Sequence, residues 1–330
     1  MNKGLKLAVA VLCAAVLGAC GKGDGGAAAG DGAITVGFSQ VGAESEWRTA
    51  NTRSVKEALA APEFNLKFSD AQQKQENQIK ALRSFIAQGV DVIAFSPVVE
   101  SGWETVLREA KAAGIPVVLT DRAVAVSNES LYATFIGSDF VEEGRKAARW
   151  LIEDSEGQAG PVRVVELQGT VGSAPANDRM KGFKEILGQD PRFTIVRSQS
   201  GDFTRAKGKE VMESFIKAEN SGKNICAVYA HNDDMAIGAI QAIKEAGLKP
   251  GKDIKIISID GVPDIFKAMI AGEANASVEL TPNMAGPAFD ALLAYKKDGT
   301  LPPKHIKTES KLFEPGSAEA QLELKKDMGY

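Results

Sequence analysis

From Ile34 onward, short apolar runs rich in β-branched residues alternate with longer amphipathic stretches. The short runs predict strands at residues 34–38, 66–68, 92–95, 116–119, 132–136, 162–167, 194–197, 225–229, 255–259 and 276–280. The longer stretches predict helices at residues 47–60, 73–88, 103–113, 141–153, 177–187, 205–219, 233–246 and 263–270. Strands separated by helices of this length are typical of βαβ units, in which helices cover both faces of a parallel sheet.

The same alternation appears twice, before and after about residue 137, although no sequence repeat is detectable. A chain of 330 residues is too long for one compact core of ordinary size and suits two domains. The pattern therefore predicts an α/β fold of two doubly wound, parallel-sheet lobes. Ligands of such open sheets bind outside the carboxyl ends of the strands, so a cleft between the lobes is the expected binding site.

The N-terminus has the pattern of an export signal. Lys3 and Lys6 form a positive segment, and the apolar run 7–17 is too short to span a bilayer permanently. The run ends in Leu-Gly-Ala-Cys, which resembles a bacterial lipobox and predicts a lipoprotein signal peptide at 1–20 with lipid on Cys20. The Gly/Ala-rich segment 21–33 then predicts a flexible tether. An ordinary signal peptide cut nearby, with Cys20 incidental, is the alternative.

Charge and cysteine content narrow the class of ligand. The net charge of −4 provides no basic patch for a phosphate backbone, so the sequence predicts no nucleic-acid partner. Cys13 lies in the signal and Cys20 would carry lipid, which leaves Cys226 alone in the mature domain. The sequence therefore predicts neither a disulfide framework nor a cysteine-rich metal site, and no cofactor or metal.

The predicted strands end in carboxylate, amide, guanidinium and indole side chains. Charged groups of this kind hydrogen-bond the hydroxyl groups of a sugar, while aromatic faces cover its apolar C–H patches. The segments that follow the strands are 39–48, 96–103, 120–122, 168–179, 231–234, 260–261 and 279–283. Because these polar ends recur in both halves, they would converge on one cleft.

Each segment alone also has a structural interpretation. Asp121-Arg122 could be an ion pair that only supports the fold, and Trp47 at a helix start could be a core residue. The sequence 231–234 (His-Asn-Asp-Asp) is also what a strand end followed by a helix N-cap looks like. The recurrence in both halves favours the binding interpretation.

Other chemistries have less support. No G-x-G-x-x-G or G-x-x-x-x-G-K-[ST] motif follows a strand, and Glu44 and Glu46 stand where a dinucleotide phosphate would need bare backbone. His231 and His305 are far apart in sequence, and no nucleophile elbow accompanies them. The chain is therefore predicted not to be an enzyme, and its many acidic groups disfavour an anionic ligand.

Several stretches together resemble the bacterial periplasmic sugar-binding proteins of the ribose/galactose-binding type, the capture subunits of ABC importers. The resemblance covers essentially all of residues 34–330, and among members of the family it is greatest to those that bind galactofuranose. It rests mainly on VGFSQVGAESEWR, DAQQKQENQIKALRSFIAQGVDVI, YAHNDDMAIGAIQAIKEAGLKPGKDI and SIDGVPDI.

The resemblance implies which residues contact the sugar. These are Glu44, Ser45, Glu46, Trp47, Arg48, Asp121, Arg122, Arg179, Asn232 and Asp260, with Ser96, Phe203 and Glu279 as further contacts. Glu46 departs from the pattern, because a small residue is expected there. A partner cysteine expected near 162–164 is absent, which fits an unpaired Cys226.

The resemblance also implies a mechanism. The lobes are expected to comprise residues 34–137 plus 282–307 and residues 138–281 plus 308–330, with crossings near Gly137, Thr281 and Lys307. They would close on a monosaccharide, galactofuranose or a related sugar, and deliver it to a membrane permease. The protein is expected to be a monomer in the periplasm or cell envelope, held to the membrane only by its lipid. A capture protein for a chemoreceptor, the effector domain of a lactose-repressor-type regulator and a sugar-modifying enzyme are the alternatives.

Overall fold

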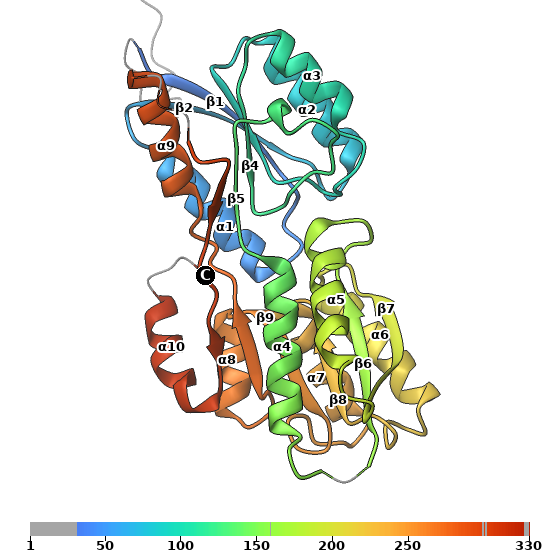
Figure 1. Ribbon diagram of the computed structural model, residues 1–330. Coiled ribbons are helices and arrows are strands. Elements are labelled where there is room, and N and C mark those ends of the chain that lie inside the picture. The colour runs from blue at the N-terminus through green and yellow to red at the C-terminus, as the bar shows by residue number, and fades with distance from the viewer. Residues whose placement is uncertain (1–31, 159, 299, 301, 327–329) are drawn as a thin grey trace, which may run out of the picture.

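Two six-stranded sheets covered by helices are stacked one above the other as two lobes (Figure 1). The structure is a computed structural model and describes residues 32–158, 160–298, 300, 302–326 and 330. The predicted fold class is confirmed. The predicted signal peptide, Cys20 and residues 21–31 of the predicted tether lie outside the described residues.

The sheet of the first lobe has the strand order β11-β5-β4-β3-β1-β2, and all its strands are parallel. Its strands are β1 (Ile34–Gln40), β2 (Phe64–Asp70), β3 (Val92–Phe95), β4 (Val117–Thr120), β5 (Thr134–Gly137) and β11 (His305–Lys307). Its helices are α1 (Glu46–Ala58), α2 (Gln75–Ala87), α3 (Glu104–Ala112), the short η1 (Glu129–Leu131) and α9 (Ala285–Asp298). Helices α1 and α9 pack together, as do α2 and α3 (Figure 1).

The sheet of the second lobe has the order β12-β10-β9-β8-β6-β7. Its strands are β6 (Val162–Gln168), β7 (Phe193–Ser200), β8 (Ala227–Ala230), β9 (Lys255–Asp260), β10 (Ala276–Glu279) and β12 (Leu312–Phe313). Its helices are α4 (Phe140–Asp154), α5 (Ala174–Leu187), α6 (Arg205–Ala218), α7 (Asp233–Glu245), α8 (Pro263–Ile270), η2 (Pro315–Ser317) and α10 (Ala318–Lys325). The edge strand β12 is antiparallel to β10, whereas the other strands are parallel.

Helices α4 and α5 approach each other unusually closely. A Cβ atom added at Gly144 would lie 2.2 Å from the carbonyl oxygen of Arg179, and one at Gly182 would lie 1.9 Å from that of Val141. Only glycine fits where two backbones are this close. The packing fixes α5, and therefore Arg179, against the first helix of the second lobe.

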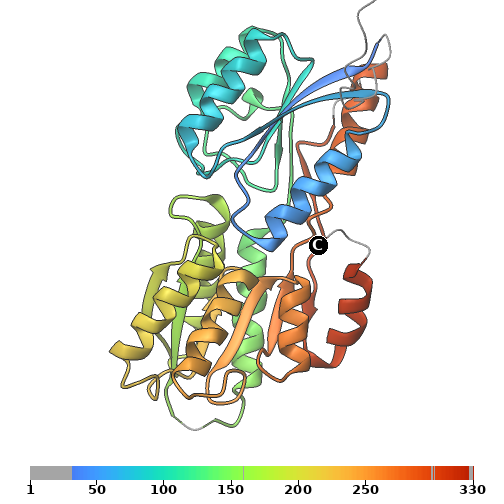
Figure 2. The same ribbon diagram turned by 180° about the vertical axis from the view of Figure 1, so that it is seen from behind.

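Side-chain caps start several helices at the boundary between the lobes. Ser45 Oγ accepts a hydrogen bond from the backbone N–H of Arg48 (3.0 Å) at the start of α1. Asn232 Oδ1 accepts one from Met235 (3.0 Å) at the start of α7. Such caps satisfy N–H groups that the helix leaves unpaired. Seen from behind, the capped end of α1 lies at the waist between the lobes (Figure 2).

The chain passes between the two sheets after β5, after β10 and after β11. The lobe boundaries given above, at residues 137/138, 281/282 and 307/308, stay a prediction. The predictions omitted α9, α10, β11 and β12. The last two strands are too short to show a periodic pattern, and Gly286 and Pro287 hide the start of α9. No helix in the described ranges is long and apolar enough to cross a membrane.

Candidate sugar-binding cleft

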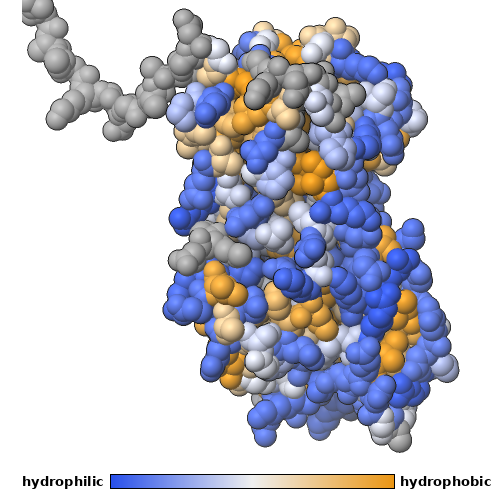
Figure 3. Space-filling view, turned by 60° about the vertical axis from the view of Figure 1, so that its left-hand side comes forward, coloured by the Kyte–Doolittle hydropathy of each residue, from blue (hydrophilic) through white to orange (hydrophobic). Residues whose placement is uncertain are grey.

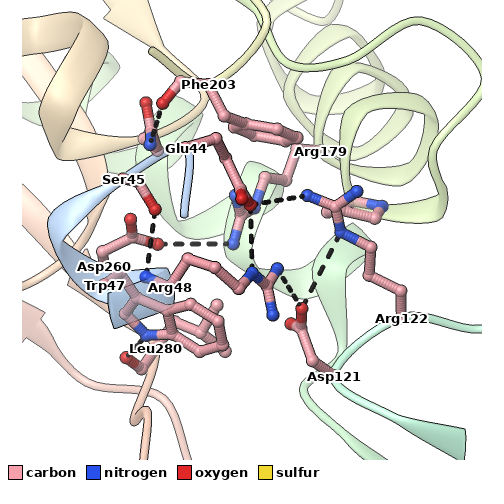
Figure 4. Close-up of a pocket in the computed structure, with 12 residues that line it drawn as sticks. Glu44, Ser45, Trp47, Arg48, Asp121, Arg122, Arg179, Phe203, Asp260 and Leu280 are labelled. Atoms are coloured by element: carbon pink, nitrogen blue, oxygen red, sulfur yellow. Dashed lines mark hydrogen bonds and ion pairs between the residues drawn. The ribbon is translucent and has the colours of Figure 1, made fainter. Parts of the chain in front are cut away.

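A cavity of about 270 Å³ lies between the lobes, at the carboxyl ends of their strands (Figure 4). Its lining is mostly polar and consists of Glu44, Ser45, Trp47, Arg48, Asp121, Arg122, Pro175, Arg179, Phe203, Asn232, Asp260 and Leu280.

In the first lobe, Arg48 is held by two carboxylates. Its Nε donates to Glu44 Oε1 at 3.0 Å, and its Nη2 donates to Asp121 Oδ2 at 2.6 Å. Burial opposes the charge on Arg48, but these two carboxylates more than compensate and raise the pKa of its guanidinium. Arg48 therefore stays charged inside the cavity. Asp121 adopts a positive φ of 63°, a conformation that is costly for a residue other than glycine.

Arg122 lies beside this pair. Its Nη1 donates to the carbonyl oxygen of Val98 at 3.1 Å, and its Nη2 lies 3.5 Å from Glu44 Oε1. Burial and the neighbouring charge of Arg48 lower the pKa of Arg122 to about 10. The residue is still protonated at neutral pH, and its buried Nε has no hydrogen-bond partner.

In the second lobe, Arg179 on α5 is held from two sides. Its Nε donates to Glu143 Oε2 of α4 at 2.9 Å, and its Nη1 donates to the carbonyl oxygen of His231 at 2.6 Å. Its Nη2 is buried without a hydrogen bond, 3.8 Å from Asp260 Oδ1. Burial raises the pKa of Asp260 well above its usual value, and Arg179 offsets this only in part.

The ring of Phe203 forms an aromatic wall of the cavity, close to two guanidinium groups (Figure 4). The ring centroid lies 5.2 Å from Arg122 Cζ and 5.9 Å from Arg179 Cζ. Phe203 has a φ of 61°, and its carbonyl oxygen accepts a hydrogen bond from Asn232 Nδ2 at 3.0 Å. A Cβ atom at Gly169 would lie 1.9 Å from the ring, so the absence of a side chain there makes room for it.

Trp47 connects the cavity to a chain crossing. Its indole Nε1 donates to the carbonyl oxygen of Leu280 at 2.6 Å, just after β10. Trp47 belongs to a buried hydrophobic core cluster and also lines the cavity, so it is a core residue whose sugar contact stays a prediction.

The lining is rich in ionisable groups and incompletely hydrogen-bonded. Three guanidinium groups face three carboxyl groups, which are those of Glu44, Asp121 and Asp260. Glu44 Oε2, Arg122 Nε and Arg179 Nη2 are buried without hydrogen-bond partners, although the two nitrogens each lie 3.8 Å from a carboxylate oxygen. Because buried polar atoms are normally hydrogen-bonded, these atoms leave two donors and one acceptor that a ligand in the cavity could satisfy.

Three predicted contacts do not line the cavity. Ser96 lies behind it, where its Oγ donates to Asp121 Oδ2 at 3.2 Å. Glu279 ends β10 and pairs with Lys325 of α10 at 3.5 Å. Glu46 begins α1 and turns away from the cavity towards the second lobe. The other ten predicted residues come together, from Glu44 to Asp260.

The predicted sugar contacts omitted Glu143, Pro175 and Leu280. The strand-end segments 168–179 and 279–283 contain Pro175 and Leu280, but neither residue was singled out because their side chains are apolar. Glu143 lies within a helix, where an acidic residue is normally solvated, and no local signal marks it as buried. The alternative assigned to residues 231–234 is also observed, because Asn232 caps α7 while lining the cavity.

The histidine, cysteine and acidic residues of the described ranges form no candidate metal centre. His231 pairs with Glu166 at 3.2 Å, and both side chains are fully buried within the second lobe. No group of three or more His, Cys, Asp or Glu residues that could hold a metal ion occurs in the described part of the chain. Cys226 is a free cysteine.

The two lobes touch each other at several places around the cavity, in addition to the bond between Trp47 and Leu280. The backbone N–H of Glu100 donates to the carbonyl oxygen of Gly172 at 2.9 Å, and Asn177 Nδ2 donates to Glu100 Oε1 at 2.9 Å. Elsewhere, the N–H of Glu46 donates to Asp234 Oδ2 at 2.8 Å. The lobes are therefore closed around the cavity.

Comparison with known proteins gives one consistent result. A family model described as a periplasmic binding protein domain matches residues 36–300. The galactofuranose-binding protein YtfQ of Escherichia coli (strain K12) is 64% identical over 297 residues, which are 90% of this chain and 93% of that protein.

Solved structures agree with this match. A crystal structure of a galactofuranose-binding protein has a TM-score of 0.88 and 64% identity, and the match covers 90% of this chain and 100% of that one. A second structure is the periplasmic binding protein component of the arabinose ABC transporter from Shewanella sp. ANA-3, bound to α- and β-L-arabinofuranose. Its TM-score is 0.85 and its identity 57%, with 89% of this chain and 96% of that one covered.

Proposed function

This chain belongs to the periplasmic sugar-binding proteins of ABC transporters, and we propose that its ligand is galactofuranose or a closely related furanose. Members of this family bind solutes and are not enzymes, so a sugar-modifying activity is excluded. The observation that carries the proposal is a set of buried atoms without hydrogen-bond partners, on Glu44, Arg122 and Arg179, in a cavity lined by both guanidinium and carboxyl groups. Sugar hydroxyl groups both donate and accept hydrogen bonds, so one ligand could satisfy all three.

We assign roles to the lining from its chemistry. Arg122 and Glu44 of the first lobe and Arg179 of the second each present a free polar atom and would bind ring hydroxyl groups directly. Asp260 lies 3.8 Å from Arg179 Nη2 and would share a hydroxyl with it. The ring of Phe203 would cover an apolar face of the sugar. Arg48 already donates hydrogen bonds to Glu44 and Asp121, so its main role would be to orient these two carboxylates.

The proposed mechanism is capture by lobe closure. Direct partners come from both lobes, so only the closed form lets the sugar make all its contacts, and the sugar therefore stabilises that form. The lobes would move about the three crossings, with the boundaries predicted from the sequence. The closed, loaded protein would then dock on the permease of its transporter.

We further propose that the protein is a monomer. The exposed large hydrophobic residues of the described chain are spread over separate elements and are Val171, Ile270, Leu312 and Leu324. On the face drawn in Figure 3, hydrophilic side chains surround the hydrophobic ones over the second lobe. A stable dimer interface would need a contiguous apolar patch.

The attachment to the cell envelope is a separate proposal. The lipobox-like sequence that ends at Cys20 and the Gly/Ala-rich segment after it support a lipid anchor with a tether. The binding lobes would then work close to the membrane that holds their permease. No nucleic-acid partner is expected.

The ligand can be tested by calorimetry together with ¹³C NMR. The purified protein should bind D-galactose with micromolar or tighter affinity, and it should not bind methyl β-D-galactopyranoside, which is locked as a six-membered ring. With [1-¹³C]galactose at equimolar protein, the furanose anomeric signals should grow relative to free sugar. Enrichment of the pyranose signals, or tighter binding of a sugar phosphate or dinucleotide, would contradict the proposal.

A further inference from the structure

Glu46 makes its contacts across the boundary between the lobes. It is the first residue of α1 in the first lobe, and its backbone N–H donates to Asp234 Oδ2 of α7 at 2.8 Å. Its Oε2 lies 3.6 Å from Arg205 Nη2 of α6 and is buried without a hydrogen-bond partner. Glu46 therefore contacts the second lobe and does not line the sugar cavity, whereas the residues on either side of it do.

In the second lobe, several charged side chains surround the position that Glu46 occupies. Arg205 already pairs with Asp234 Oδ1 at 3.1 Å and with Asp264 Oδ2 of α8 at 2.9 Å, and Lys267 pairs with Asp264 at 2.9 Å. We call these four residues and Glu46 the Glu46 cluster. Its three carboxylates share one guanidinium and one ammonium group, so an ionised Glu46 adds a negative charge that has no free cation to pair with.

Closure therefore changes the environment of a single carboxyl group. In an open form, Glu46 would face water at a helix N-terminus, a position that favours its ionised state. In the closed form, burial and repulsion from Asp264 and Asp234 outweigh attraction to Arg205 and Lys267, and raise the pKa of Glu46 from 4.5 to about 7. The phenol of Tyr330 is a further titratable group that interacts with Glu46.

We propose that Glu46 is a positioning residue for lobe closure, which couples the capture of the sugar to the uptake of one proton through the Glu46 cluster. The proposal rests on the proposed function, because closure is what sugar binding would stabilise. The closed form holds the proton more tightly than the open form. The stabilisation of closure is therefore fully present below about pH 4.5 and is lost as the pH rises through about 7.

The test is the pH dependence of sugar binding. Between about pH 8 and about pH 5.5, the Kd of the native protein for galactose should fall by about tenfold, less than the full shift in pKa would give, because water screens part of the interaction. Calorimetry near pH 6.5 in two buffers with different heats of ionisation should report net proton uptake on binding. Glu46→Gln cannot ionise, so it should lose most of the pH dependence and take up fewer protons.

Two further variants sharpen the result. Asp264→Asn removes a repelling carboxylate and frees Arg205, so the midpoint of the pH dependence should move to lower pH. Glu57→Gln changes a carboxylate of the same helix that is 63% exposed and paired within α1, and it should behave like the native protein. Thermal melting without sugar should be alike for native and Glu46→Gln protein.

The outcomes separate the two proposals. If the native protein binds no furanose at any pH, the proposed function is wrong, and the proposed role of Glu46 in closure is wrong with it. If the native protein binds sugar but Glu46→Gln shows the same proton uptake and the same change in Kd with pH, the role of Glu46 alone is overturned.

Discussion

Arg179 has two separable roles, one in the fold and one in the cleft, and a pair of variants can measure each. Arg179→Met removes a buried cation that pairs with Glu143 Oε2 at 2.9 Å and with the carbonyl oxygen of His231 at 2.6 Å. Glu143 is fully buried, and it would be left without the cation that it pairs with. Breaking a buried pair in this way destabilises a protein by about 3–5 kcal/mol, so the free energy of unfolding should fall by that amount.

The double variant Arg179→Met/Glu143→Met removes both partners at once. Methionine is close in length to both side chains and adapts to irregular spaces. Replacing a buried pair by apolar residues of similar volume is often neutral, so unfolding stability should return to within about 1 kcal/mol of the native value.

Sugar binding should not recover with stability. Both variants lack Nη2, the one Arg179 donor that is buried and unpartnered. A hydrogen bond from a charged donor is worth about 1.5–3 kcal/mol, so Kd should rise by about ten- to a hundredfold in both variants.

Urea unfolding without sugar measures the first effect, and calorimetry with galactose measures the second. If the double variant binds sugar like the native protein, Arg179 supports the fold and does not contact the ligand. If the single variant is as stable as the native protein, the account of the buried Glu143 pair is wrong.

Three further predictions follow from individual contacts. Gly169→Ala would place a Cβ atom 1.9 Å from the Phe203 ring, so the ring must move and the Kd for sugar should rise by about tenfold or more in calorimetry; unchanged affinity would show that Phe203 does not cover the ligand. Trp47→Phe loses the hydrogen bond to the Leu280 carbonyl oxygen, and urea unfolding should show a loss of about 1 kcal/mol, whereas no loss would mean that water replaces the bond. Cys20→Ala should abolish palmitate labelling, and native protein that incorporates no palmitate would rule out the anchor.

The sequence predicts the fold well where burial leaves an unbroken apolar run. Strands β3, β4 and β8 are buried along their whole length. Each overlaps a short apolar run that the sequence pattern predicts to be a strand. The rule that ligands bind at the carboxyl ends of strands predicts that Asp121, Asn232 and Asp260 lie close together. The structure places all three in the lining of one cavity. These successes depend on local patterns that tertiary contacts do not alter.

The rest depends on contacts between distant segments. Strand β11 has only three residues and exists because β5 offers it an edge 170 residues away in sequence, from His305 to Phe135. Glu143 is buried because Gly144 brings two helices together, and nothing in its own segment indicates this. Glu46 belongs to the same sequence motif as its cavity-lining neighbours, but its position in the first turn of α1 directs it to the other lobe.

The shared C-terminal segment has a consequence for how the protein is made. β11 completes the sheet of the first lobe beside β5, and β12 completes that of the second beside β10, a few residues later in the chain. A chain whose synthesis stops before His305 therefore lacks one strand in each sheet, and the edges of β5 and β10 that stay unpaired are sites for pairing with other chains. A single C-terminal truncation is thus expected to damage both lobes at once.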